Sequence, residues 1–175
     1  MKRDPSHIEE LEGAPPRRVF SIMDNVELVK RSFEAISAWD VDALLRLYDP
    51  DVELLPLTGT RVESGGYRGH DGVRDYMAEA RDLWDVLEPE GRLHEDLGDR
   101  VLVAGHCRVR GRSSGAESDP ATSWVIHIRN GRIVSHRACA TYGEAAELAG
   151  VEPAADSAVW LRRRSLPAPG CFGRR

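Results

Sequence analysis

Apolar side chains recur every three or four residues in three stretches of the first half of the chain, which is the spacing of amphipathic helices. The pattern predicts helices over about 26–36, 41–48 and 71–87. A short strand is expected over 52–57, and the polar, Gly-rich segment 58–70 is expected to form a loop. The first half is therefore predicted to be mainly helical.

The second half alternates between apolar and polar residues, as the strands of a half-buried sheet do. Four such runs are predicted to be strands: about 92–97, 100–112, 121–129 and 132–141. Asn130-Gly131, between the last two, is a strong hairpin signal. A short helix is expected near 142–149. This order predicts an α+β fold, in which a curved, mainly antiparallel sheet wraps as a cone-shaped barrel around about three N-terminal helices.

The turn of the last hairpin decides which residues face the inside of the cone. Trp124 and Ile126 lie on the apolar face of the strand before the turn. A two-residue loop would place Arg137 opposite Trp124, whereas a three-residue loop ending in a bulge at Gly131 would place His136 there. We favour the bulged register because it keeps the inner wall apolar.

His136 then becomes a lone ionisable side chain on an apolar wall. Burial lowers the pKa of an imidazole, so the ring would be neutral near pH 7 and could act as a general base or a hydrogen-bond donor. The alternative is a core histidine bonded to a backbone carbonyl. A carboxylate, Tyr or Arg partner within hydrogen-bond distance would favour catalysis.

Several short segments, weak one by one, occur in a characteristic order and spacing. They are Asn25-Val-Glu-Leu-Val, Asp40-Val-Asp-Ala-Leu-Leu, Asp49-Pro-Asp-Val-Glu, Tyr67-Arg-Gly-His-Asp-Gly-Val, Gly98-Asp-Arg-Val-Leu-Val, Ser114-Gly, Arg129-Asn-Gly-Arg-Ile and Glu144-Ala-Ala-Glu-Leu-Ala-Gly. Together they resemble the SnoaL-like (polyketide-cyclase-like) branch of the nuclear transport factor 2-like superfamily. The resemblance covers about residues 25–151, which leaves a loose leader over 1–24 and a Pro- and Arg-rich tail over 152–175. Met23, directly before the first predicted helix, is a candidate for the start of translation in place of Met1.

This resemblance implies a cone with one apolar pocket, usually a homodimer through the outer face of the sheet. Family members include cofactor-free isomerases, cyclases, dehydratases and epoxide hydrolases, besides proteins that only bind or assemble. Ketosteroid isomerases of the superfamily use a carboxylate base, which would fall on Leu55 or Pro56. Their other two functional positions fall on Ser32 and Trp124. Ketosteroid isomerisation with the usual residues is therefore excluded.

Further residues are expected at the pocket on these grounds. The side chains predicted to bind substrate are Trp124, Tyr67, Tyr76, Trp84, Ile126 and Leu54. Glu95 is a candidate acid or base if its face of the strand turns inward. The strand alternation places His106 on the outer face, whereas superposition on distant relatives places it in the pocket. Both are kept beside His136 as catalytic candidates.

Composition and charge narrow the classes of partner. The 175 residues carry a net charge of −5, and residues 25–150 alone carry 15 basic and 22 acidic side chains, which argues against nucleic acid. No apolar run approaches the ~20 residues of a membrane span. Three unpaired cysteines are typical of a cytoplasmic protein. No metal-binding spacing, phosphate loop or nucleophile elbow is found, so no metal or cofactor is expected.

The sequence therefore predicts a cytoplasmic small-molecule pocket protein. The favoured function is a cofactor-free acid/base enzyme, an isomerase, cyclase or dehydratase, that acts on an apolar cyclic or polyketide-like substrate. The alternative is a non-catalytic ligand-binding or dimeric accessory protein of the same fold.

Overall fold

The computed structural model describes residues 24–58 and 65–152 of the chain. Nearly all of the predicted leader and of the predicted tail lies outside these residues, as does Met23. These two predictions therefore stay untested.

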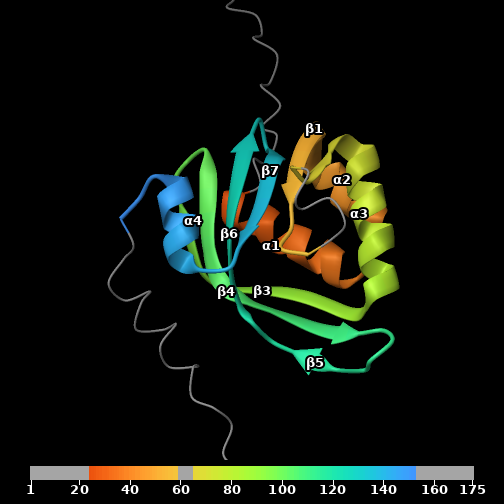
Figure 1. The fold of residues 1–175 in the computed structure, drawn as a ribbon. Helices are drawn as coiled ribbons and strands as arrows, with labels where there is room; N and C mark the ends of the chain where they lie inside the picture. The colour runs from red at the N-terminus through yellow and green to blue at the C-terminus, as the bar shows by residue number, and fades with distance from the viewer. Residues whose placement is uncertain (1–23, 59–64, 153–175) are drawn as a thin grey trace, which may run out of the picture.

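Three helices pack against one face of a curved seven-stranded sheet, and a fourth helix packs against the other face (Figure 1). The helices are α1 (Asn25–Ser37), α2 (Val41–Leu47), α3 (Gly69–Leu83) and α4 (Tyr142–Ala149). The strands are β1 (Tyr48–Leu55), β2 (Tyr67–Arg68), β3 (Trp84–Asp96), β4 (Arg100–Gly111), β5 (Glu117–Ser118), β6 (Ala121–Arg129) and β7 (Arg132–Cys139). The predicted α+β architecture is confirmed.

The strand order is β2-β1-β7-β6-β4-β3, with β5 beside β4. Only β1 and β7 run parallel among these described pairs; the others are antiparallel. This pairing brings β1, from the helical half of the chain, beside the last strand. No helix in the described part of the chain is long and apolar enough to cross a bilayer.

Side-chain alternation gives the sheet two apolar faces. Val103, Trp124 and Ile126 face the core that α1, α2 and α3 cover. Leu102 and Val125, on the opposite face, pack beneath α4. Helix α4 therefore covers this part of the outer face.

The hairpin between β6 and β7 differs from both predicted registers. Its turn has two residues, Asn130 and Gly131, both with positive φ (53° and 71°), as a type I′ turn requires. The bulge lies further along, where Val134 is the extra residue of β7. The face prediction for His136 holds, but its predicted pairing with Trp124 is wrong: His136 lies opposite Ile126.

Helix α3 ends four residues earlier than its apolar spacing predicts. Trp84 and Leu87 belong to β3, because this segment pairs with β4 along its whole length. Pro89 fits within β3 since β3 is an edge strand, where a residue without an N–H leaves no ladder bond unmade. The predicted helix over 71–87 is therefore wrong from Trp84 onward.

Candidate functional site

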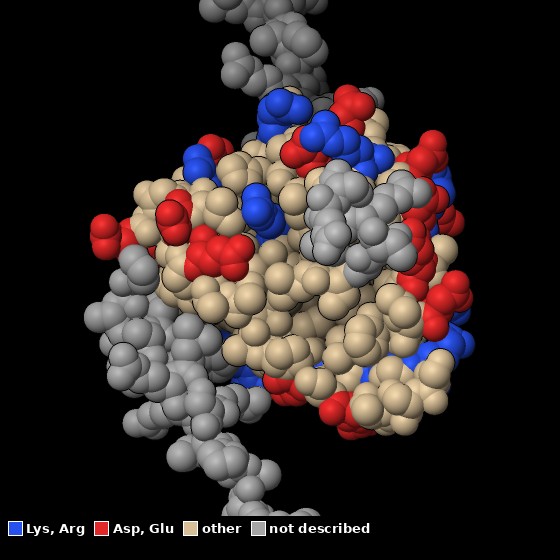
Figure 2. Space-filling model, viewed as in Figure 1, with Lys and Arg blue, Asp and Glu red and all other residues tan. Residues whose placement is uncertain are grey.

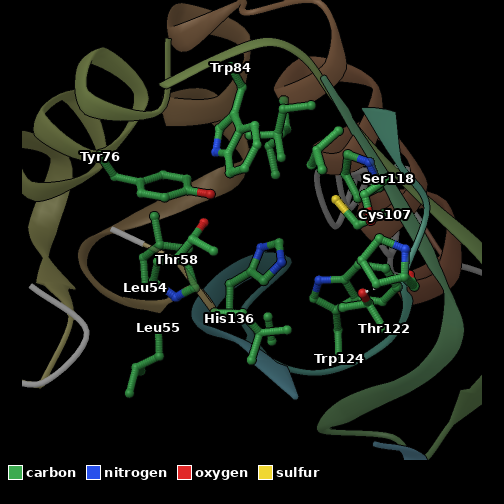
Figure 3. Close-up of a pocket in the computed structure, with 18 of the residues that line it drawn as sticks. Leu54, Leu55, Thr58, Tyr76, Trp84, Cys107, Ser118, Thr122, Trp124 and His136 are labelled. Carbon is green, nitrogen blue, oxygen red and sulfur yellow. Dashed lines mark hydrogen bonds between the residues drawn. The ribbon is translucent and has the colours of Figure 1, made fainter. Parts of the chain in front are cut away.

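The open end of the cone holds a cavity of about 530 Å³, within the range of small-molecule sites (Figure 3). Its walls come from the end of β1, from α3 and β3, and from the inner faces of β4, β6 and β7. Most of the lining is apolar. The surface in the middle of the face shown in Figure 2 is also largely uncharged, while charged side chains gather along α3 and beside α4.

His136 lies on β7 and lines this cavity. Its neighbours in the sheet are Leu54 on β1 and Ile126 on β6, and the ring centroid of Phe33 is 5.8 Å from its own. The side chain is only 3% exposed. Burial lowers the pKa of His136 from 6.5 to about 4, so the ring is neutral at pH 7.

Tyr48, the first residue of β1, contacts the side of the His136 ring that faces away from the cavity. The Tyr48 hydroxyl lies 2.5 Å from Nδ1 of His136. Tyr48 is fully buried, does not line the cavity, and its pKa is raised by burial. Because Nδ1 is taken by Tyr48, Nε2 is the ring nitrogen that a ligand in the cavity can reach.

Tyr48 is not among the residues predicted at the site. The helical period placed it at the end of the second helix, and its partner is 88 residues away. Only the parallel pairing of β1 with β7 brings the two together, and no local pattern reports that pairing. The Tyr partner that would favour catalysis is thus present, at a position that no local pattern singles out.

Three other aromatic side chains present polar groups at the cavity. Tyr76 lies on α3, Trp84 at the start of β3 and Trp124 on β6; Figure 3 shows the His136 ring between Tyr76 and Trp124. Four polar groups at the cavity form no hydrogen bond with the described residues: the Tyr76 hydroxyl, the two indole N–H groups and Nε2 of His136. None of the four atoms is fully buried by the surrounding protein. A bound molecule can therefore engage them.

Cys107 also lines the cavity, on β4. Burial raises the pKa of its thiol to about 12, so the sulfur stays protonated and is a poor nucleophile. Among the residues that the structure describes, no group of three His, Cys, Asp or Glu side chains is arranged to hold a metal ion.

Of the six side chains predicted to bind substrate, Leu54, Tyr76, Trp84 and Trp124 line the cavity and two do not. Tyr67 is buried behind it, where its hydroxyl donates to Glu79 at 2.7 Å and its ring packs against Tyr76. Ile126 is fully buried beside His136 and supports the wall from within.

The two further catalytic candidates lie on the opposite face of the sheet. Glu95 pairs with Leu102, an outer-face residue, and accepts a hydrogen bond from Tyr142 of α4 at 3.4 Å. It does not line the cavity, because the alternation of β3 turns it outward.

His106 likewise faces outward from β4. Its Nδ1 contacts Asp119, and its Nε2 lies 3.3 Å from the Glu90 carboxylate and within hydrogen-bond distance of Arg92. The alternation of the strand therefore gave the right face, and the placement of His106 in the pocket is wrong. His136 remains, of the three catalytic candidates, the one that lines the cavity.

Comparison with protein families gives a match between residues 29–136 and the SnoaL-like domain. An NTF2-like protein of unknown function from Burkholderia pseudomallei is 25% identical, with a TM-score of 0.59 over 71% of this chain and 95% of that chain. A putative polyketide cyclase from Sinorhizobium meliloti is 25% identical, with a TM-score of 0.52 over 69% of this chain and 100% of that chain.

A third structure shares the fold alone. It is a hypothetical protein with a ketosteroid isomerase-like fold from Catenulispora acidiphila, which is 13% identical, with a TM-score of 0.59 over 74% of this chain and 96% of that chain. No curated protein matches the sequence.

Proposed function

The chain belongs to the SnoaL-like domain family, and on this premise we propose that it is an enzyme that catalyses proton transfer on an apolar, ring-shaped substrate. The reaction class is isomerisation, cyclisation or dehydration. The similarity to a putative polyketide cyclase supports a polyketide-like substrate. His136 is the group that exchanges a proton or a hydrogen bond with the substrate.

The observation that carries this proposal is the position of His136 between Tyr48 and the cavity. A histidine that serves only the core would have both ring nitrogens bonded or enclosed by protein. Here Nδ1 is held by Tyr48, and Nε2 forms no bond to any described residue at a cavity wall. An imidazole with one nitrogen held by the protein and the other open to a ligand is the arrangement that acid/base chemistry needs.

The neutral state of the ring supports the same role. With a pKa of about 4, His136 carries no charge at pH 7 and adds no electrostatic penalty when an apolar molecule fills the cavity. A neutral imidazole has one N–H and one lone pair. With the proton on Nε2 it can polarise the carbonyl of a substrate while solvent takes the α-proton, and with the proton on Nδ1 it can take the α-proton itself.

The proposal can be tested with a simple cyclic ketone. The exchange of α-protons of 2-tetralone for deuterium in D₂O is followed by NMR with and without the protein. We expect the protein to accelerate exchange and His136→Phe to lose about 10²–10⁴-fold of that rate, because a phenyl ring can neither donate a hydrogen bond to the ketone nor take a proton. The matched control His106→Phe, on the outer face, should keep the full rate.

A second function is favoured by one observation. Of the described residues that line the cavity, the sole carboxylate is Glu117, whose side chain is 59% exposed, so no acid lies deep in the site as a partner for His136. This arrangement fits a ligand-binding protein without catalysis. Binding of 2-tetralone with no accelerated exchange, across further ketones of the same size, would select this alternative.

A further inference from the structure

We infer that the cavity recognises an uncharged ring-shaped ligand by a carbonyl-type oxygen that accepts a hydrogen bond from Nε2–H of His136, and that Tyr48 is the positioning residue that keeps the proton on Nε2. The inference shares with the proposed function only the placement of a ligand against His136. It requires no turnover.

The position of the proton follows from the surroundings of Tyr48. A buried hydroxyl is almost always hydrogen-bonded, and in the described part of the chain His136 is the one partner of the Tyr48 hydroxyl. The phenol can donate only if Nδ1 accepts. A neutral imidazole carries a single N–H, so that proton then resides on Nε2.

The opposite tautomer is disfavoured. If Nδ1 carried the proton, it would donate to the Tyr48 oxygen, and the Tyr48 O–H would have no acceptor in a core where Tyr48 is 0% exposed. An unsatisfied buried donor costs about 1–3 kcal/mol. The resting protein therefore presents an N–H donor to the cavity and not a lone pair.

Two further polar groups of the cavity wall can only donate. The indole N–H groups of Trp84 and Trp124 can donate but cannot accept, and in the described residues neither has a partner. Trp124 and His136 are both more than nine-tenths buried. A wall with several unpaired donors selects a ligand that brings acceptors, and ring carbonyls are the acceptors that an apolar molecule carries.

The absence of charge in the wall selects an uncharged ligand. Glu117 is the one charged residue among the described lining residues, and it lies at the exposed β5 strand, 3.9 Å from Arg110. A charged ligand would lose its water of hydration in the cavity without gaining an opposite charge, which is strongly unfavourable.

The tautomer can be read directly by NMR. Long-range ¹H–¹⁵N spectra of ¹⁵N-histidine-labelled protein distinguish a protonated Nε2 from a protonated Nδ1. We expect His136 to be the Nε2–H form in the wild type and a mixture of both forms in Tyr48→Phe. A wild-type His136 with the proton on Nδ1 would overturn the inference, and this outcome does not depend on whether the variant folds.

Ligand recognition can be measured with a matched pair of tricyclic probes, 9-fluorenone and fluorene, which differ in the carbonyl oxygen. Calorimetric titration gives the ratio of the two dissociation constants. We expect His136→Phe to shift this ratio against fluorenone by about 3–10-fold, the effect of one hydrogen bond, and His136→Gln, which keeps an N–H, to shift it little. An unchanged ratio in His136→Phe would contradict the inference.

These results separate the inference from the proposed function. A fluorenone preference that depends on His136, without accelerated exchange of 2-tetralone in the wild type, would uphold carbonyl recognition and reject catalysis. Accelerated exchange in the wild type, with an unchanged fluorenone-to-fluorene ratio in His136→Phe, would uphold catalysis and reject carbonyl recognition by His136.

Discussion

The hydroxyl of Tyr48 and Nδ1 of His136 form a buried hydrogen bond of 2.5 Å that joins the first residue of β1 to the middle of β7. The bond lies behind the cavity wall, so it fixes the ring that a ligand meets without itself meeting the ligand. It also links the helical half of the chain to the last strand of the sheet.

We therefore predict that Tyr48→Phe lowers the free energy of unfolding by about 1–3 kcal/mol, because it leaves the Nδ1 atom of His136 without a partner in the core. Urea denaturation measures the change. The control is Tyr48→Phe in a His136→Phe background, where no bond remains to be lost and the change should be much smaller. Equal losses in both backgrounds would show that the hydrogen bond does not stabilise the fold.

The depressed pKa of His136 predicts a specific loss of stability in acid. The pKa is about 4 in the folded protein and 6.5 for an unperturbed histidine. Between these values the unfolded chain binds more protons than the folded one, so stability falls as the pH drops from 6.5 to 4, by about 3 kcal/mol in total. Above pH 6.5 this residue adds no pH dependence.

Unfolding curves of the wild type and of His136→Phe, measured from pH 7 to pH 4.5, test this prediction. His94 and His127 also have pKa values lowered by burial, so both proteins should lose stability in acid. The variant should lose less. Parallel curves for the two proteins would mean that His136 is not a neutral buried group.

Much of the fold could be predicted from local patterns. Asp24 and Thr141, residue types that favour the position before a helix, cap α1 and α4, and Gly150 ends α4 with a left-handed φ of 70°. The alternation in β4 and β6 gave the inner face of the sheet. These features depend on residues only a few positions apart, so they can be predicted from local sequence patterns.

The wrong predictions about the fold and the site share one cause, which is the pairing of strands that lie far apart in the sequence or shift in register. The apolar spacing from Val73 to Leu87 fits a helix, but pairing with β4 turns the segment from Trp84 onward into a strand. The shift of the β6–β7 register comes from a bulge inside β7, which no turn residue signals. The partnership of Tyr48 with His136 likewise depends on β1 lying beside β7.

The turn between β6 and β7 gives a prediction about stability. Gly131 has a φ of 71°, and a Cβ added there would meet no atom within 4 Å, so substitution acts on the backbone alone. We expect Gly131→Ala to lower the free energy of unfolding by about 1–2 kcal/mol. Gly143→Ala is the matched control: its Cβ would also meet nothing within 4 Å, but Gly143 lies in the first turn of α4, where alanine should be tolerated without loss of stability. A loss in both variants would contradict this account.

The cavity itself can be tested by filling it. Ala138 lies opposite Trp124 on the inner face and lines the cavity, so Ala138→Leu places additional side-chain atoms in space that is otherwise free for a ligand. We expect the affinity for 9-fluorenone to fall at least about tenfold, or about 1.4 kcal/mol, with a small loss of stability because Ala138 is only partly buried and borders the cavity. Ala140→Leu, an exposed position just after β7, is the control and should bind as the wild type does. If Ala138→Leu bound the probe normally, the probe would occupy another site; if it unfolded the protein, this part of the cone would be packed core and not a ligand cavity.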